Sequence, residues 1–479
     1  MHAKEGMSAM QLTCEARTFW LGCILLVMGS IAALGAEADE NGPTGSFTVG
    51  GDYAGVHGDE DKFREDRWTY DGLRLGIRNF ETELTQNAWD VEVEGRLMQP
   101  GDYRGLVRMS RDDFGFIQLD YEEFDTYDDS SNLFYPFAPR TYDHGEDLVK
   151  TWRDANLTFG WRPPESPDVT VNYQRWEKFG GRSILHGGEV TDGNVTLNRY
   201  PLYEELDEAR NRLSVAISDT IGGFDVQLKQ TFEEMDGHNE FNSLIFDSTG
   251  SLDEIRRIDY WPEHQTWLTE FTAEGDLLPD LLNLEVSASY SDLEPESNYD
   301  ENAFNEDGTP SAREHFNYNF VNNEHTGEGR RISWNTRLTF TPTDMWTFFG
   351  GLGYNNEYDN HRSVKNIDAP HRSQFFPGDM PTWPWDPDGV VSRQWIYDTD
   401  FQRDVWKYNG GLQVEPLSWV TGRLEGKLEQ NDVTYDWSGI ETMDFASAGD
   451  RLRWLSDGQF HKTEVVPSLT IRPHEDVKL

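Results

Sequence analysis

The sequence predicts an all-β fold in which a long antiparallel meander forms a large transmembrane β-barrel. Three observations lead to this prediction. Apolar and polar residues alternate along most of the chain, short turns alternate with long loops, and the composition is both acidic and rich in aromatic residues. Together they describe strands with one apolar and one polar face, joined so that the two ends of the sheet differ.

The alternation is clearest in residues 224–232, where Phe224, Val226, Leu228 and Phe232 share one face and polar residues occupy the other. Residues 331–340 and 420–429 repeat the pattern, with charged residues on the second face. Successive side chains of a strand point to opposite faces, so this period of two predicts strands. About sixteen strands are expected, near residues 45–56, 67–80, 88–98, 103–110, 113–123, 151–161, 168–178, 210–218, 224–232, 265–275, 281–291, 331–340, 345–355, 402–414, 420–429 and 462–472.

The connections between these strands are of two kinds. Short polar turns recur near residues 163–167, 218–223, 278–280, 342–344 and 415–417. Long loops are expected over residues 180–208, 235–263, 293–329, 359–400 and 432–459. Outer-membrane barrels have short periplasmic turns and long extracellular loops, and a tilted strand of about 9–11 residues crosses the bilayer. The pattern therefore predicts an outer-membrane barrel with its apolar face toward lipid. The alternative is a soluble propeller or sandwich, whose connections would be short on both sides.

The composition excludes several other classes of protein. The 479 residues include 41 Lys and Arg against 87 Asp and Glu, which gives a net charge of −46. This charge would repel phosphate backbones, so the chain is not a general nucleic-acid binder. The 17 Trp, 19 Tyr and 27 Phe argue against a disordered chain.

Residues 1–38 have the features of a cleaved export signal. Lys4 and Arg17 supply positive charge ahead of an uncharged stretch over residues 19–36, and the small residues up to Ala38 fit a cleavage site. The mature chain has no apolar run of the roughly 20 residues that a membrane helix needs. We therefore expect an exported protein that crosses the membrane with strands.

The barrel domain is predicted to occupy residues 39–479. The two cysteines, Cys14 and Cys23, both precede it, so this domain carries neither a disulfide nor covalently attached c-type haem. Its last residues, 477–479, resemble the start of a further strand, and we expect the barrel to be truncated at its C-terminus.

No motif predicts catalysis or metal binding. The glycines of residues 350–353 lie within an alternating strand and lack the helix and lysine of a phosphate loop, so they are expected to let the sheet bend or a large neighbour pack. His186, His238 and His371 are isolated and are expected to be solvated. The acidic segments 305–308 and 386–389 offer hard oxygen ligands, but neither completes a calcium loop. We therefore expect no enzyme and no metal site.

One segment carries a resemblance to a known family. Residues 103–109 and 113–121 form a hairpin pattern, followed by Phe124-Asp125-Thr126-Tyr127-Asp128-Asp129-Ser130-Ser131 and Phe134-Tyr135-Pro136. A strand running into a Y-D-x-S loop resembles the decahaem-associated outer-membrane β-barrels of the MtrB/PioB type. The local match covers about fifty residues. It lacks the C-x-x-C pair that some members carry near the mature N-terminus.

The resemblance implies that the barrel is a sheath around a periplasmic multihaem c-type cytochrome, which carries electrons across the outer membrane. Haem is then expected only on that partner, and the chain has no cofactor of its own. The alternatives are a diffusion porin for small polar solutes and an adhesion or receptor barrel that acts through its acidic loops. The candidate lumen-facing contacts to the partner are Arg331, Arg337, Arg423, Glu425, Lys427 and Glu429.

Overall fold

The structure is a computed structural model of the chain. It describes residues 44–58, 60–67, 72–86, 88–98, 101–128, 133–134, 141–142, 148–192, 195–246, 252–304, 319–370, 390–417, 419–443 and 451–471. The predicted export signal (residues 1–38), the acidic segments 305–308 and 386–389, His371 and residues 477–479 lie outside these ranges.

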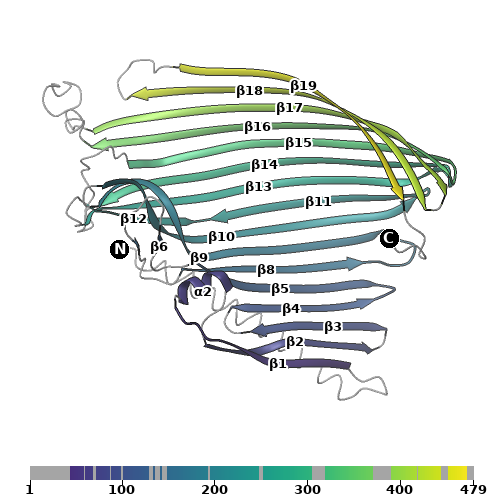
Figure 1. Cartoon of the computed structure of the whole chain (residues 1–479), viewed down its shortest axis with the longest axis horizontal. Coiled ribbons are helices and arrows are strands. Elements are labelled where there is room, and N and C mark those ends of the chain that lie inside the picture. The colour runs from purple at the N-terminus through teal and green to yellow at the C-terminus, as the bar shows by residue number, and fades with distance from the viewer. Residues whose placement is uncertain are drawn as a thin grey trace.

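The described chain forms a 17-stranded antiparallel sheet whose strands follow one another in chain order (Figure 1). The strands are β1 (Thr44–Ala54), β2 (Gly72–Gln86), β3 (Trp89–Met98), β4 (Asp102–Arg111), β5 (Gly115–Asp128), β8 (Leu148–Trp161), β9 (Asp168–Asp192), β10 (Val195–Ile221), β11 (Phe224–Gly237), β12 (Asn239–Phe246), β13 (Leu252–Leu278), β14 (Leu282–Phe304), β15 (Asn319–Thr343), β16 (Trp346–Pro370), β17 (Val390–Leu417), β18 (Val420–Met443) and β19 (Arg451–Ile471).

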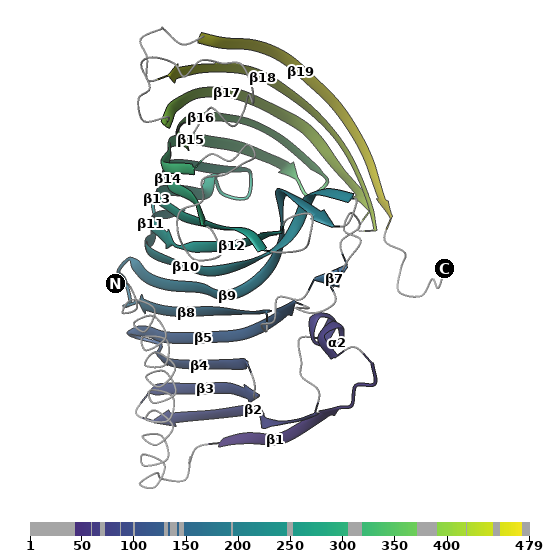
Figure 2. The ribbon, with the colours of Figure 1, turned by 90° about the vertical axis from the view of Figure 1, so that its left-hand side faces the viewer.

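The sheet curves strongly, so that it has a concave and a convex face, like the wall of a barrel (Figure 2). Within the described residues, β1 pairs only with β2 and β19 only with β18. The strands β6 (Leu133–Phe134) and β7 (Thr141–Tyr142) form a separate pair. The helix α2 (Glu60–Arg67) contacts β5, where the guanidinium of Arg64 lies 5.2 Å from the ring centroid of Tyr127. None of the described helices is long and apolar enough to cross a bilayer.

Tight turns gather at one end of the sheet, as predicted. The β10–β11 turn consists of Gly222 and Gly223, both with positive φ (63° and 86°). Such two-residue turns match the twist of the strands that they join, and glycine adopts this conformation without a steric penalty. Asp280 has a φ of 58° in the β13–β14 turn, where the Leu281 amide donates to the Leu278 carbonyl over 3.1 Å.

The structure corrects the predicted strand lengths. The expected ten-residue strands are 23 to 28 residues long in β9, β10 and β13 to β17, apart from the shorter β11–β12 pair. They continue through much of the segments predicted as loops, residues 180–208, 235–263, 293–329, 359–400 and 432–459. The sequence does not reveal these segments as strands because polar residues interrupt the apolar alternation on both faces, although Leu206 and Ile258 are buried. Cross-strand pairs hold them, such as the Asn360 side-chain amide donating to Asp400 over 2.7 Å.

Most apolar residues of the strands share one face of the sheet, which we assign to the convex side and call the outer face, because an outer-membrane barrel turns its apolar face to lipid. Leu228, Trp267, Leu338 and Phe348 are 40 to 52% exposed there. Aromatic rings flank this apolar band on both sides. On β15, Trp334 and Phe340 lie six residues apart, about 20 Å at 3.3–3.4 Å per residue, which approaches the roughly 25 Å apolar band of outer-membrane barrels.

The ring contacts define two girdles. In the upper girdle, toward the long ends of the strands, the ring centroids of Tyr354 and Trp406 are 4.7 Å apart, and those of Phe232 and Trp267 are also 4.7 Å apart. In the lower girdle, near the tight turns, those of Phe340 and Phe348 are 6.2 Å apart. A two-faced antiparallel wall with an apolar outer band confirms the predicted fold class and places the protein in the outer membrane.

Candidate functional site: the charged concave face

The cross-strand register places all six predicted contact residues on one face, opposite the outer face, and we assign this face to the concave side. Arg331 and Arg337 on β15 alternate with Ile332 and Leu338, which are 42% and 43% exposed on the outer face. Residues directly opposite each other in neighbouring strands share a face. Arg337 is opposite Gly351, which is opposite Asn409, which is opposite Lys427. The charged residues of β18 therefore face the same space as those of β15.

Most of these charges already have partners. Glu425 lies between the two cations of its own strand, with its carboxylate oxygens 3.0 Å from Arg423 Nη2 and 3.5 Å from Lys427 Nζ. On β15, Arg331 lies 2.9 Å from Glu357 and Arg337 lies 3.9 Å from Glu285. The side chains of Arg337 and Lys427 remain 40% and 48% exposed, so both can still contact a molecule in the concavity.

Glu429 lines a hollow of about 260 Å³ together with cations from three strands. Lys462 is directly opposite it on β19, and the Lys462 amine lies 2.7 Å from Glu464. Lys407 and Lys427 lie on the same wall. The predicted contact set is therefore part of a larger patch with charges of both signs.

Phe349 anchors the two arginines and was not predicted from the sequence. Its ring is 8% exposed, with the guanidinium carbons of Arg423 and Arg337 4.4 Å and 5.6 Å from its centroid. The ring covers Gly411, where an added Cβ would lie 2.7 Å from it and 2.3 Å from the Leu424 carbonyl oxygen. Cations this close to an aromatic ring are attracted by its negative quadrupole. Phe349 therefore fixes both arginines on the concave face.

The glycine cluster of residues 350–353 lies within β16, as predicted. Asn409 occupies the space above Gly351, where an added Cβ would lie 2.2 Å from its Oδ1 atom. The cluster therefore admits a neighbouring side chain, which was one of the two roles expected of it. His238 is 44% exposed, as expected of a solvated residue, but it also has partners. Its Nε2 atom lies 3.1 Å from Asp259 and its ring stacks on Trp261 at 5.1 Å.

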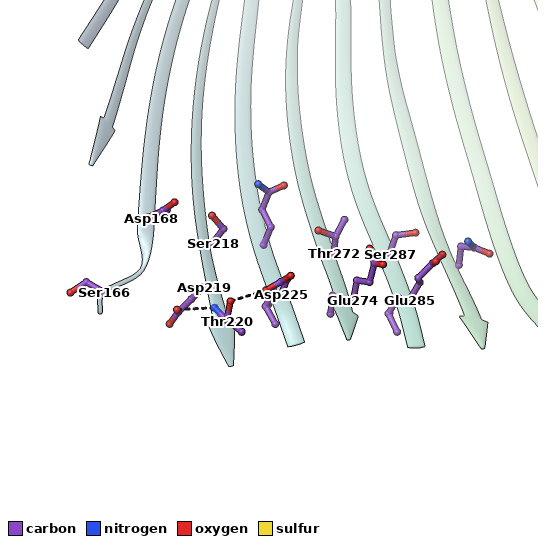
Figure 3. A pocket seen from close by; sticks show the side chains of 15 residues that line it. Ser166, Asp168, Ser218, Asp219, Thr220, Asp225, Thr272, Glu274, Glu285 and Ser287 are labelled. Atoms are coloured by element: carbon purple, nitrogen blue, oxygen red, sulfur yellow. Dashed lines mark hydrogen bonds between the residues drawn. The ribbon is translucent and has the colours of Figure 1, made fainter. Parts of the chain in front are cut away.

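A second, larger hollow of about 660 Å³ lies near the tight turns (Figure 3). Asp225, Glu274 and Glu285 are directly opposite one another on β11, β13 and β14. The hydroxyl of Thr220 donates to Asp225 over 2.7 Å. Sequence reasoning missed this acidic group because the three residues become neighbours only through the strand register.

The acidic group and the predicted cations lie on one continuous line of directly opposite residues, which we call the charged rung. It runs across nine strands from β10 to β19: Thr220, Asp225, Glu274, Glu285, Arg337, Gly351, Asn409, Lys427 and Glu464. Its charge changes from negative on β11–β14 to positive on β15 and β18, and it is negative again at β19. In the described part of the chain, no group of three or more His, Cys, Asp or Glu side chains is arranged to hold a metal ion.

Comparisons with known proteins define no family. No protein-family model matches the sequence, and no curated protein matches it. Among solved structures, the ferric yersiniabactin uptake receptor FyuA from Yersinia pestis is similar, with 8% identity, a TM-score of 0.38, and coverage of 90% of this chain and 72% of that one. The copper transporter OprC is similar with 8% identity, a TM-score of 0.35, and coverage of 83% and 65%. The assignment of the fold rests on the strand ladder and its two faces.

Proposed function

We propose that the chain forms the wall of an outer-membrane sheath that holds a multihaem c-type cytochrome in its lumen and does no redox chemistry itself. The observation that carries this proposal is the charged rung. A wall with acidic and basic sectors suits a protein surface of complementary charge, because close pairs gain strength when they are partly removed from water. The resemblance to the MtrB/PioB type supports the choice of partner.

The cytochrome would supply every haem, so the roles of this chain are to enclose, to orient and to insulate. Arg337 and Lys427 are the residues that we expect to pair with acidic groups of the partner, since they lie on one rung and are exposed. Asp225 and Glu274 would pair with its basic groups. A diffusion porin remains the second candidate, because the hollow near the tight turns is polar and large enough for small solutes.

Reconstitution in liposomes with a trapped redox dye tests the proposal. External reductant should bleach the dye only when the barrel and a multihaem cytochrome from the same cells are both present, and the two proteins should copurify. Reversing Arg337 and Lys427 together to Glu should weaken copurification at least tenfold. The control Arg453→Glu changes an exposed residue on β19 and should leave copurification unchanged. Rapid sugar flux after saturation with cytochrome would instead favour the porin.

A further inference from the structure

The concave face of β17, β18 and β19 carries aromatic residues beyond the upper girdle. Lys427 and Trp437 are an even number of residues apart on β18, and the pairing of β18 with β19 runs without a shift, so both side chains lie on the concave face. Four successive lines of directly opposite residues form what we call the aromatic patch: Thr399, Trp437 and Trp454; Phe401, Tyr435 and Ser456; Arg403, Val433 and Gly458; and Val405, Asn431 and Phe460.

The aromatic patch contains no acidic residue, although 87 of the 479 residues of the chain are Asp or Glu. The other face of the same segments of β17 and β18 is acidic. It carries five aspartates: Asp398, Asp400, Asp404, Asp432 and Asp436. Both faces lie beyond the apolar band, so the bilayer does not account for the difference. The composition indicates that the concave face contacts something less polar than water at this point.

Gly439 lets two rings lie across the sheet beside the patch. A Cβ added at Gly439 would lie 2.9 Å from Cη2 of Trp437 and 3.3 Å from Cδ1 of Tyr397, so both rings lean over the glycine. Their centroids are 5.9 Å apart and their planes are 27° from parallel. Trp454 is directly opposite Trp437 and is 68% exposed. Rings that lie across a sheet in this way turn a face toward the concavity.

Aromatic rings on other strands of the sheet already have cationic partners. The guanidinium carbon of Arg153 lies 4.5 Å from the ring centroid of Phe179, and Lys178 Nζ lies 5.5 Å from that of Trp152. In the part of the chain that the structure describes, no cation lies over a ring of the aromatic patch in this way. The faces of these rings are therefore open to a ligand.

The middle of the patch has hydrogen-bond donors beside open space. A Cβ added at Gly458 would have no atom within 4 Å, and the neighbouring rings of Tyr435 and Phe460 are 36% and 48% exposed. Arg403 Nε donates to Asn431 over 3.3 Å, and no carboxylate among the described residues forms an ion pair with this guanidinium. The two Nη atoms of Arg403 can therefore donate to a ligand.

The size of the patch fits a short chain molecule and not a folded protein. Trp454 and Phe460 are six residues apart, about 20 Å at 3.3–3.4 Å per residue, and three neighbouring strands span about 10 Å. The patch therefore covers about 200 Å², whereas a stable protein interface buries about 800 Å² on each partner. The negative face of an aromatic ring attracts the polarised C–H groups on the flat side of a sugar ring, as it attracts the positive edge of another aromatic ring.

We propose that the aromatic patch binds a linear oligosaccharide, with sugar rings stacked on Trp437 and Trp454 and a sugar oxygen accepting from Arg403. An extended glycan suits the patch because the exposed rings follow one another along the strands, from Trp454 to Phe460. Its hydroxyl groups can also pair with Thr399 and with water at the rim. The site lies beyond the upper girdle and is independent of any cytochrome.

Isothermal titration calorimetry of the full chain tests this site, with cellohexaose as the probe and no cytochrome present. The detergent must lack sugar head groups, as lauryldimethylamine oxide does, because a maltoside would compete for the patch. Cellohexaose should bind at one site and at least tenfold more tightly than glucose, since several of its rings stack at once. Equal affinities for cellohexaose and glucose would overturn the assignment to a chain of sugars. A complete lack of cellohexaose binding would overturn the site.

Three variants locate the oligosaccharide. Trp437→Ala and Trp454→Ala should each weaken cellohexaose binding about tenfold, which corresponds to the loss of one strong ring contact. Gly439→Val keeps every ring but pushes Trp437 away from the sheet, and it should also weaken binding about tenfold. The control Leu455→Ala removes a 55% exposed side chain next to Trp454 on the outer face and should leave binding unchanged. Heat-dependent gel migration verifies that each variant still folds.

The double variant Trp437→Ala/Trp454→Ala decides between the sugar and a protein partner. Unchanged cellohexaose binding in this variant would refute the site. If the parent chain binds no cellohexaose and the double variant loses copurification with the cytochrome, the patch belongs to the protein contact of the proposed function, and the oligosaccharide assignment is wrong.

Discussion

The membrane band and the extension of the same strands are built on one hydrogen-bonded ladder but have different surfaces. Between the girdles, as from Trp334 to Phe340, the outer face is apolar and the concave face is polar. Beyond the upper girdle polar residues occupy positions on both faces, as in the pairing of Asn360 with Asp400. Backbone N–H and C=O groups are paired between strands in both regions. The medium that each face meets, lipid or water, therefore determines whether its side chains are apolar or polar.

The comparison teaches that bilayer thickness sets the length of the apolar band but not the length of the strands. The short strands β3 and β4 have 10 residues each, which is close to the bilayer crossing, whereas β17 has 28. Polar pairs across strands replace apolar packing in the additional length. Such pairs are individually weak in water, so the extension should tolerate substitutions that the band does not.

The largest expected effect comes from a charge on the outer face of the band. Leu228→Arg, at a position that is 49% exposed, should destabilise the folded barrel by about 2–4 kcal/mol, because the guanidinium would lie in hydrocarbon. Gln265→Arg, just beyond Trp267 of the upper girdle, should cost about 0–1 kcal/mol. Denaturant titration of the barrel in lipid vesicles measures both. Equal costs would place the membrane border elsewhere.

A smaller effect is expected on the concave face of the band. Gly411→Ala should destabilise by about 1–3 kcal/mol, because the new Cβ would lie 2.3 Å from a backbone carbonyl oxygen and would push against Phe349. Gly410→Ala is the matched control. A Cβ added at Gly410 would lie 3.6 Å from the Phe349 carbonyl oxygen, its nearest neighbour, and would face lipid. Stability should therefore change little. Heat-dependent gel migration compares the two, and a similar loss in both would contradict the packing described for Phe349.

Glu233, directly beyond Phe232, offers a pH-dependent test in the extension. Burial alone would raise the pKa of its carboxyl, but hydrogen bonds from His264 and Arg212 outweigh burial and lower the pKa. The stabilisation is therefore complete above the carboxyl pKa of the unfolded chain, about 4.3, and is lost as the pH falls through the lower folded value. Glu233→Gln should cost about 1–3 kcal/mol at pH 7.

The difference between Glu233→Gln and the parent should shrink toward zero as the pH falls through the lowered folded pKa of the parent carboxyl, because that carboxyl then becomes protonated. Thermal unfolding in detergent, measured across this pH range, gives the comparison. A constant difference at all pH values would mean that the substitution acts through shape and not through charge.

The smallest effect is expected at Asp436 and Arg453. Hydrogen bonding from Arg453 lowers the pKa of Asp436, yet the Arg453 side chain is 68% exposed, so water and salt screen the pair. Asp436→Asn should therefore leave the thermal midpoint unchanged within error at physiological salt. A clear loss of stability would mean that exposed pairs hold the extension together, and the difference between extension and band would disappear.

The sequence could predict where strands cross the membrane and which charges share a face, because both follow from a period of two. Arg337 and Lys427 share a face through this alternation, whereas the register brings them onto one rung. Strand length could not be predicted, since polar residues on both faces resemble a loop until their cross-strand partners are known. The same holds for Phe349 and Arg153, whose neighbours come from other strands and depend on register.

The charged rung would also restrict how a molecule inside the barrel rotates about the barrel axis. A wall of uniform charge would let an enclosed protein turn freely about the barrel axis, whereas a wall that changes sign between Glu285 and Arg337 has preferred angular settings. The charge pattern around the wall would thus fix the orientation of an enclosed molecule about the barrel axis. Each side of an enclosed molecule would then face a fixed group of strands. Its exposed ends would have a defined rotation about the barrel axis as well as a defined position along it.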